Sequence, residues 1–369
     1  MMELVYFSAT LLTLLGGHAI LLAVIIRFFS IESWPAQFVL GAVMLFFFLS
    51  VLFSSYLIHK RDNFFIRSYY ILSALWIGVF VNLSLVSAVI VIIKIATPLT
   101  GFYLPFWLQN IILFGGTVLI SAIGIYNALK PKVTSYDVHI KDLPDPWDGK
   151  TIVQVSDVHL GPVYRKRFFY RVIDQVNALK PEAVFITGDL FDGMEAEFSW
   201  LNHPFTRLHA PRGAYYSFGN HDLYLGFSRV KRLLSDNPIK ILDDKMVVVD
   251  GLQIIGINYS FDSNFDLQRA ILKQVEYSAD KPSLLMFHAP KNIDLAKKVG
   301  IDLQLSGHTH DGQMFPYNLV IKWGHRGYGY GFFNEGDFNL IVSCGVGSWG
   351  PPMRTAARSE IVKIVLHKK

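Results

Sequence analysis

The first 130 residues alternate long apolar stretches with short polar breaks. Each stretch has at least the roughly 20 residues that a helix needs to cross a bilayer core of about 30 Å. Buried core helices seldom follow one another in this way, so the pattern predicts a bundle of four transmembrane helices. Their expected ranges are 4–29, 36–58, 69–93 and 107–129.

From residue 151 onward, short apolar segments alternate with amphipathic ones. This pattern is typical of an α/β domain in which early strands pair in parallel and later, closely spaced strands form hairpins. So many strands predict two sheets with helices outside them. The expected strands are 151–156, 183–187, 214–218, 240–242, 246–249, 252–257, 283–287, 302–306, 319–323, 339–343 and 361–366. The expected helices are 165–180, 194–208, 228–235, 266–277 and 292–299.

The two patterns divide the chain into a transmembrane region (1–130), a linker (131–150) and a soluble domain (151–369). Pro144, Pro146 and Gly149 make the second half of the linker rich in turns. Such a short tether holds the domain close to the bilayer. The sequence therefore favours a lipid or a membrane-proximal molecule as the substrate.

Basic residues are concentrated in the loop between the second and third spans and after the fourth span, which predicts that both termini and the soluble domain are cytoplasmic. These residues are Lys60, Arg61, Arg67, Lys130 and Lys132. The formal net charge of +5 and the isoelectric point near 9.0 are explained by attraction to an anionic leaflet, so no nucleic-acid partner is expected. One cysteine cannot form an internal disulfide, in keeping with a cytoplasmic domain.

Polar residues that can bind metal follow the predicted strands at five places. Because ligands of open α/β sheets bind at the carboxyl ends of strands, we expect these residues to meet at one edge. The five motifs are Ser-Asp-Val-His, Gly-Asp, Gly-Asn-His-Asp, a single histidine and Gly-His-Thr-His. The candidate ligands within them are Asp157, His159, Asp189, Asn220, His288, His308 and His310.

Taken singly, each motif has a structural explanation, as polar residues at a loop start or a capped turn. It is their repetition at five strand ends that predicts a metal site. Imidazole, carboxylate and amide ligands form a mixed nitrogen and oxygen set, which favours Mn, Fe or Zn over Ca. We expect two divalent ions, with Mn as the first choice.

In order and spacing, the motifs resemble those of the calcineurin-like metallophosphoesterases, and the run Gly-His-Thr-His-Asp-Gly-Gln resembles their membrane-associated bacterial branch. The resemblance covers about residues 150–366 and says nothing about the four spans. It implies an αββα sandwich of two sheets, a dinuclear site that hydrolyses phosphate esters, and a location in a bacterial inner membrane.

Carried over residue by residue, the resemblance implies that Asp189 bridges two metals. The first metal would also bind Asp157, His159 and His310, and the second Asn220, His288 and His308. His221 would stabilise the phosphate or protonate the leaving group, and Asp222 would orient its imidazole. Asp311 departs from the pattern, because related sequences often have glycine there, and this puts the shape of the substrate entrance in doubt.

Basic residues outside the motifs are candidates for contact with the substrate. Arg326 and Arg354 lie in glycine-rich segments that could cover the site, although hairpin turns also explain these glycines. The segment from Tyr164 to Arg171 mixes bases with aromatic residues. It fits either a helix at the membrane surface or an ordinary amphipathic helix.

Three functions remain open. The first is a membrane-anchored, two-metal phosphodiesterase or pyrophosphatase whose substrate is lipid-linked, such as a nucleotide-linked lipid. The second is a phosphomonoesterase or protein phosphatase that uses the same site. The third is an inactive regulatory module, against which the complete set of ligands argues. No acidic residue lies within a span, so transport is not favoured.

Overall fold

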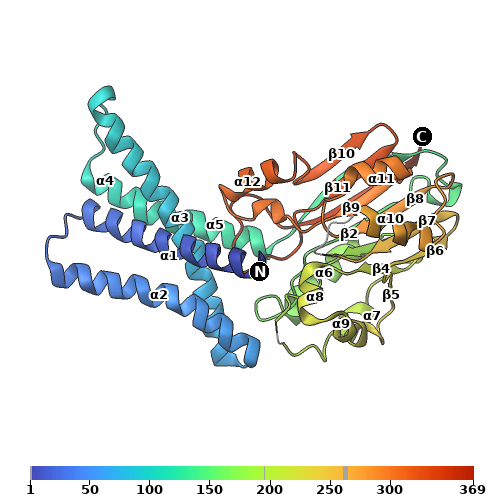
Figure 1. Ribbon diagram of the computed structural model, residues 1–369, viewed down its shortest axis with the longest axis horizontal. Coiled ribbons are helices and arrows are strands. Elements are labelled where there is room, and N and C mark those ends of the chain that lie inside the picture. The colour runs from blue at the N-terminus through green and yellow to red at the C-terminus, as the bar shows by residue number, and fades with distance from the viewer. Residues whose placement is uncertain (1, 195, 261–264) are drawn as a thin grey trace. The chain divides into compact units, whose positions relative to one another are not determined.

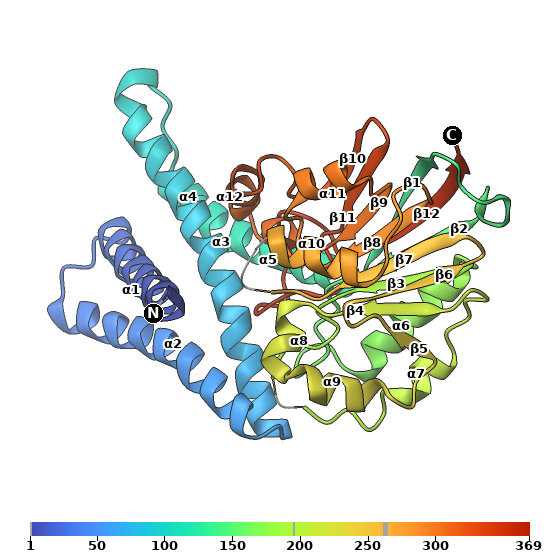
Figure 2. The same cartoon turned by 45° about the vertical axis from the view of Figure 1, so that its right-hand side comes forward.

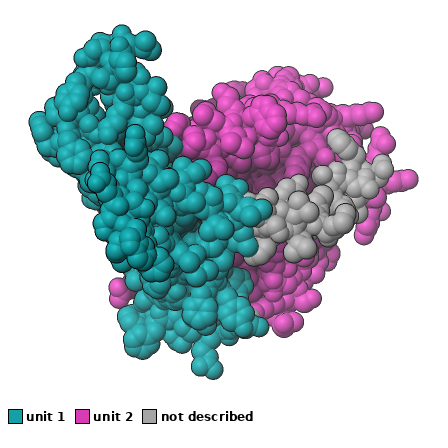
Figure 3. Space-filling model, turned by 60° about the vertical axis from the view of Figure 1, so that its left-hand side comes forward, with its two compact units in different colours: residues 1–123 teal, residues 124–369 magenta. Residues whose placement is uncertain are grey.

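The computed structural model describes residues 2–194, 196–260 and 265–369. The chain forms two compact units, residues 1–123 and residues 124–369 (Figure 3). The first contains most of the apolar N-terminal region. The second contains the predicted α/β domain together with the last turns of the helix that precedes it.

Four helical segments near the N-terminus are long and apolar enough to cross a membrane, as the sequence predicts. The last of them runs from α4 through a π-helical turn into α5 without a break. Their bounds are α1 (Met2–Phe28), α2 (Trp34–Lys60), α3 (Phe64–Thr100), α4 (Phe106–Asn110), the π-helical turn (Ile111–Gly116) and α5 (Thr117–Leu129).

The few polar side chains of unit 1 help to join its helices. Nε1 of Trp76 donates to Nε2 of His18 at 3.0 Å, and Nδ2 of Asn82 donates to Oγ of Ser121 at 3.0 Å. In a bilayer such groups have no water to bond to, so partners on neighbouring helices satisfy them.

Unit 2 is built around two mixed six-stranded sheets (Figure 1). The order of the first is β1 (Lys132–Ile140), β12 (Glu360–Lys368), β2 (Thr151–Val155), β3 (Ala183–Thr187), β4 (Ala214–Ser217) and β5 (Ile239–Ile241). The order of the second is β10 (Gly331–Glu335), β11 (Phe338–Val342), β9 (Leu303–Ser306), β8 (Ser283–Phe287), β7 (Leu252–Ile257) and β6 (Lys245–Val249).

The pairing follows the expectation in part: the early strands are parallel, but most of the later strands are parallel as well, and β10, which was not expected, forms one of the hairpins. Strands β2 to β5 are parallel, as are β7, β8, β9 and β11. The β6–β7 and β10–β11 pairs are antiparallel hairpins. Asp250 and Gly251 have φ values of 47° and 87° in the first hairpin, the positive pair that a tight two-residue turn requires.

The two sheets pack face to face, with helices on their outer faces (Figure 2). Aromatic and aliphatic side chains such as Phe185, Tyr215 and Met286 fill the space between the sheets. Helices α6 (Lys166–Ala178), α7 (Asn202–Thr206), α8 (Asn220–Leu225) and α9 (Phe227–Leu234) accompany the first sheet, and α10 (Phe265–Gln274) and α11 (Ile293–Val299) the second. This is the predicted αββα sandwich.

Several expected elements differ in the structure. Residues 319–323 are not a strand but part of α12 (Tyr317–Gly324), because an apolar run of five fits either element. Within 194–208, of which residue 195 lies outside the described residues, only α7 is helical. Strand β1 occupies the first part of the expected linker, and its partner β12 lies more than 200 residues away.

Helix α6 is an ordinary amphipathic helix rather than a surface-binding one. Phe168 and Phe169 are both buried in the core on the outer face of the first sheet. Val172, Ile173 and Val176 continue the same buried face at helical spacing. Phe168 and Phe169 are therefore not available to a membrane, whereas Tyr170 is partly exposed.

Replacing Phe185 by alanine is expected to lower the free energy of unfolding of unit 2 by about 3–5 kcal/mol, because Phe185 is fully buried and stacks on Tyr215. Urea unfolding in detergent, followed by tryptophan fluorescence, measures this loss, since Trp147 lies in the same core. Val248→Ala, at a position that is 58% exposed, is the control and changes stability little. Equal effects of the two substitutions would contradict the proposed packing between the sheets.

Candidate metal centre

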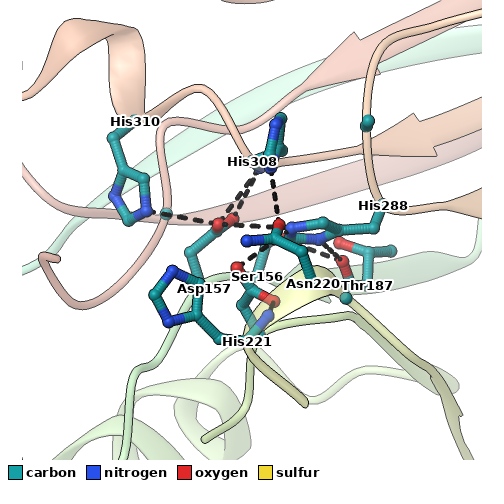
Figure 4. A network of polar contacts seen from close by, with 12 residues as sticks. Ser156, Asp157, Thr187, Asn220, His221, His288, His308 and His310 are labelled. Atoms are coloured by element: carbon teal, nitrogen blue, oxygen red, sulfur yellow. Dashed lines mark hydrogen bonds and ion pairs between the residues drawn. The ribbon is translucent and has the colours of Figure 1, made fainter. Parts of the chain in front are cut away.

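The predicted ligands all lie just beyond the carboxyl ends of strands. Asp157 and His159 follow β2, Asp189 follows β3 and Asn220 follows β4 in the first sheet. In the second sheet, His288 follows β8, and His308 and His310 follow β9. Parallel strands bring these ends to one edge, and the two sheets bring both edges together (Figure 4).

The backbone of the ligand loops is strongly bent. Asp157, His159, Asp189, His308 and His310 all have positive φ values, between 50° and 72°. This left-handed conformation is costly for residues with a side chain and is found where the surrounding structure enforces it, often at functional sites. It turns each ligand away from its strand direction and into the same space.

Two glycines allow the loops to approach one another. Gly188 has a φ of 89°, and a Cβ atom there would lie 2.5 Å from Nδ1 of His288. A Cβ atom on Gly219 would lie 2.1 Å from Oδ1 of Asp189. Only glycine leaves room for the ligands at these two positions.

One group of ligand atoms joins β2 to β9. Nε2 of His159 and Nε2 of His310 are 3.0 Å apart, and Nε2 of His310 lies 3.4 Å from Oδ1 of Asp157. Single ligand atoms from these three residues all lie within 4.8 Å of one another. The group is large enough to surround one cation.

A second group lies beside it. Nε2 of His288 is 3.1 Å from Oδ2 of Asp189. One ring nitrogen of His308 lies within 4.8 Å of a ligand atom of each of these two residues. Nδ1 of His308 lies 2.8 Å from Oδ1 of Asn220, which adds an amide oxygen. Asp189 also approaches His159, at 4.0 Å, so this carboxylate stands between the two groups.

The donor set fits cations. Nδ1 of His288 donates to the carbonyl of Thr187 at 2.7 Å, which leaves the lone pair of Nε2 for another partner. Nε2 is buried, has no hydrogen-bond partner among the described residues and faces two carboxylates, Asp157 at 3.9 Å and Asp189 at 3.1 Å. Only a positive charge, either a proton or a metal ion, stabilises that arrangement.

The pKa values of these residues show the same need for a positive charge beside the carboxylates. Burial alone would lower the pKa of His288, but the carboxylates of Asp189 and Asp157 raise it to about 10. Burial raises the pKa of Asp157. Burial and the positive charge of His288 lower the pKa of His308 to about 3, so that this imidazole stays neutral, the form that binds metal.

His221 lies at the rim of both groups. Its Nδ1 donates to the carbonyl of Asp192 at 3.0 Å, so Nε2 is the ring atom left for a substrate. Its ring meets His159 edge to face, with centroids 4.7 Å apart. His221 also belongs to a third candidate group, with His159 and Asp189.

Asp222 does not orient the His221 ring as the sequence analysis expected. Its carboxylate instead accepts hydrogen bonds from the backbone N–H groups of Asp189, Phe191 and Gly219. It is fully buried and ties the loop after β3 to the start of α8. Burial and the neighbouring Asp189 raise its pKa to about 7.

The two arginines expected at the substrate differ. Arg354 is fully buried, and its guanidinium donates to the carbonyls of Gly347 and Cys344 and lies 2.9 Å from Nδ1 of His310. It therefore supports a ligand and cannot reach a substrate, contrary to the prediction. Arg326 is exposed in the loop after α12, with a φ of 52°, and no described contact assigns it to the site.

Sequence reasoning missed Asp192, which is buried with Oδ1 3.2 Å from Nδ1 of His159. No hydrogen bond joins these two atoms, so the buried carboxylate acts on the ring through its proximity and charge. It also missed Tyr224 and Trp349, both 57% exposed and both in ring contact with His221. The spacing of Asp192 three residues after Asp189 was the available signal; the two aromatic residues had none.

Asp311, where the sequence departs from the family pattern, has a φ of 48°. Glycine adopts this backbone conformation without strain, and aspartate is among the residues that tolerate it. The next residue, Gly312, has a φ of 67°, and a Cβ atom there would lie 2.3 Å from the backbone of Asn318. The turn after His310 is therefore kept despite the aspartate.

Comparison with known proteins agrees with this geometry. The family model described as calcineurin-like phosphoesterase matches residues 150–312. An uncharacterized metallophosphoesterase of Campylobacter jejuni is 35% identical over 66% of this chain and 66% of its own length. An uncharacterized metallophosphoesterase of Aquifex aeolicus is 30% identical over 67% of this chain and 97% of its own.

A relative from Danio rerio is described as a transmembrane protein with a metallophosphoesterase domain. It is 30% identical over 68% of this chain and 61% of its own length. The aligned regions thus span less than two thirds of the Campylobacter and Danio proteins. Taken together, the motifs at the strand ends, the two-sheet sandwich and these relatives show that the chain belongs to the calcineurin-like metallophosphoesterase family.

Proposed function

We propose that the chain is a membrane-anchored, metal-dependent enzyme that hydrolyses a phosphodiester or pyrophosphate bond. The observation that carries the proposal is the convergence of histidine and aspartate atoms from five strand ends into overlapping groups, each within 4.8 Å. His159 joins the first group to the third and Asp189 joins the third to the second, and the third group contains His221, whose Nε2 is left for substrate. An inactive module would have no need to keep this complete set buried and strained.

In the proposed site, Asp157, His159, Asp189 and His310 hold one divalent cation, and Asp189, Asn220, His288 and His308 hold the other. Mn²⁺ is our first choice, with Fe or Zn as alternatives, because the donors are imidazole nitrogens together with carboxylate and amide oxygens. Two such cations activate a water and neutralise the charge on the phosphate during an in-line displacement.

In the proposed reaction, the water gives up a proton to solvent and its oxygen attacks phosphorus, the bond from phosphorus to the leaving oxygen breaks, and that oxygen takes up a proton. His221 supplies the proton from Nε2, with its ring held by the carbonyl of Asp192. Tyr224 and Trp349 stand on either side of the same imidazole as partly exposed aromatic surfaces. They would contact the group that leaves.

We place the domain on the cytoplasmic side of a bacterial inner membrane. The basic loop at residues 60–67 and the basic residues after α5 support this orientation, since positive residues flanking short loops remain in the cytoplasm. The short stretch of chain between the fourth span and the domain favours a lipid-linked substrate. A phosphomonoesterase or protein phosphatase remains the alternative, and relative rates on diesters, lipid pyrophosphates and monoesters separate the two.

Replacing Asp189 by asparagine is expected to abolish hydrolysis. Loss of the shared charge removes several kcal/mol of transition-state stabilisation, or about 10³-fold or more in rate. The measurement is Mn-dependent hydrolysis of an activated aryl phosphodiester by the detergent-solubilised protein, which EDTA also abolishes. Asp174→Asn is the control, because Asp174 is 53% exposed. Unchanged hydrolysis by Asp189→Asn would refute the enzyme proposal.

Replacing His221 by alanine is expected to lower kcat by about 10²- to 10⁴-fold for a diester with a basic alcohol as leaving group. The loss should be much smaller with nitrophenolate, which leaves without a proton. His209→Ala, an exposed histidine, serves as the control. A loss independent of the leaving group would instead assign His221 to binding of the phosphate.

Replacing Asp192 by asparagine is expected to weaken the binding of Mn²⁺ by about 10- to 100-fold, because groups that orient a ligating histidine typically contribute this much. Calorimetric titration of the metal-free protein measures it without reference to activity. The Asp174→Asn variant again provides the comparison. Equal affinities for the two variants would show that Asp192 does not support His159.

A further inference from the structure

Helix α12 presents an apolar surface that no part of the described chain covers. None of its residues is buried, although it consists largely of aliphatic and aromatic residues. Five large apolar side chains are exposed in the nine residues from 315 to 323, and Trp323 alone is 85% exposed. They are Phe315, Tyr317, Leu319, Val320 and Trp323.

Such a concentration of exposed apolar side chains along the sequence is unusual for unit 2. Elsewhere among the described residues of that unit, the exposed large apolar residues are more scattered: Tyr126, Leu129 and Val133 are spread over eight positions, and others such as Val248 and Trp349 are isolated in the sequence. A scattered apolar residue on a surface needs no explanation, whereas a contiguous patch usually marks a site of contact with a partner or a membrane. The exposed apolar surface of α12 therefore indicates a contact with a partner or a membrane.

The charges around α12 point to the kind of occupant. No aspartate or glutamate occurs between residues 312 and 334, whereas Lys322 and Arg326 are both exposed. Tryptophan and tyrosine together with lysine and arginine are the residues that collect at the boundary between headgroups and acyl chains. Basic residues beside an apolar face match the anionic surface of a phospholipid leaflet.

The attachment of α12 places its start near residues 124–129, the part of α5 that belongs to the same unit. Phe315 N donates to Oγ1 of Thr355 at 3.1 Å, and Thr355 N donates to the carbonyl of Gln313 at 3.0 Å. The adjacent Arg354 N donates to the carbonyl of Gly124 in α5 at 2.8 Å. One short segment thus links the start of α12 to the last turns of α5.

Helix α12 is also joined directly to the candidate metal centre. His310 precedes Tyr317 by seven residues, and the turn between them is held by Gln313, whose side chain bonds the carbonyls of Trp349 and Pro351. After the helix, the carbonyl of Gly329 accepts a hydrogen bond from Oγ1 of Thr309 at 2.6 Å. A surface that holds α12 would therefore lie next to the ligand loop.

We propose that α12 is an interfacial helix, whose exposed apolar residues enter the anionic phospholipid leaflet of the membrane that the chain spans. Lys322 and Arg326 then lie among the lipid headgroups. The helix holds the mouth of the metal centre against the leaflet, so that a phosphoester carried by a lipid reaches the ligands without leaving the membrane. The statement about substrate rests on the proposed function; the position of the helix does not.

The position is tested with single spin labels in the full chain. The only native cysteine, Cys344, is buried, so a label reacts with an introduced one; the labelled wild-type protein gives the background. Leu319→Cys and Trp323→Cys are compared with Val248→Cys, which is similarly exposed but lies on β6. The proteins are reconstituted in vesicles of phosphatidylcholine and phosphatidylglycerol.

We expect labels at 319 and 323 to collide with oxygen and to be shielded from a water-soluble nickel chelate, and the label at 248 to behave in the opposite way. Nickel accessibility at 319 and 323 equal to that at 248 would overturn the proposal. Dipolar broadening between labels, which indicates that a second copy covers the helix, would also overturn it.

The consequence for the substrate is tested with the double variant Leu319→Gln and Trp323→Gln. We expect hydrolysis of a phosphodiester embedded in vesicles to fall by about tenfold, while kcat/KM for a soluble aryl phosphodiester stays unchanged. An equal loss on both substrates would refute the role in substrate access and indicate a structural one. If the wild-type protein hydrolyses neither, the proposed function fails, and the spin-label result still decides the position of the helix.

Discussion

Two carboxylates buried within one rim of histidines are the constraint on which the rest of unit 2 depends. Asp157 and Asp189 have almost no exposed surface and both approach His288, whose pKa they raise far above its usual range. Charges of one sign cannot be kept out of water at such distances without a compensating positive charge. The site therefore requires positive charge, from protons or from metal ions, and the surrounding loops are shaped to keep the carboxylates in place.

That requirement explains features that would otherwise be unfavourable. Five of the candidate ligands adopt left-handed backbone conformations. Gly188 and Gly219 have no Cβ atom, which would otherwise clash with His288 and Asp189. Asp222 uses both carboxylate oxygens to hold backbone N–H groups of the neighbouring loops. The strain is tolerated because two sheets with three buried clusters hold the strand ends rigidly.

The loop that carries Arg354 connects this site to the last membrane-length helix. The backbone of Arg354 bonds Gly124 and Asn127 at the end of α5, and its side chain lies against His310. The same loop holds the turn that leads into α12 through Thr355 and Gln313. Within unit 2, the end of α5, the candidate ligand His310 and the exposed apolar helix are thus all bonded to one short segment of backbone.

The sequence by itself determined what depends on local pattern. Four apolar runs specified four membrane-length helices, and buried strands such as 183–187 and 283–287 were evident because continuous apolar segments bounded by turns have few alternatives. Five motifs at strand ends indicated which histidines and carboxylates meet at one edge, since parallel strands bring their carboxyl ends together. Only the tertiary structure decided what depends on distant partners. Strand β1 forms because it pairs with β12. The carboxylate of Asp222 accepts hydrogen bonds from backbone N–H groups, and the buried guanidinium of Arg354 lies against His310. It also decided that residues 317–324 form an exposed helix, because a short apolar run fits either a helix or a strand and its surroundings select between them.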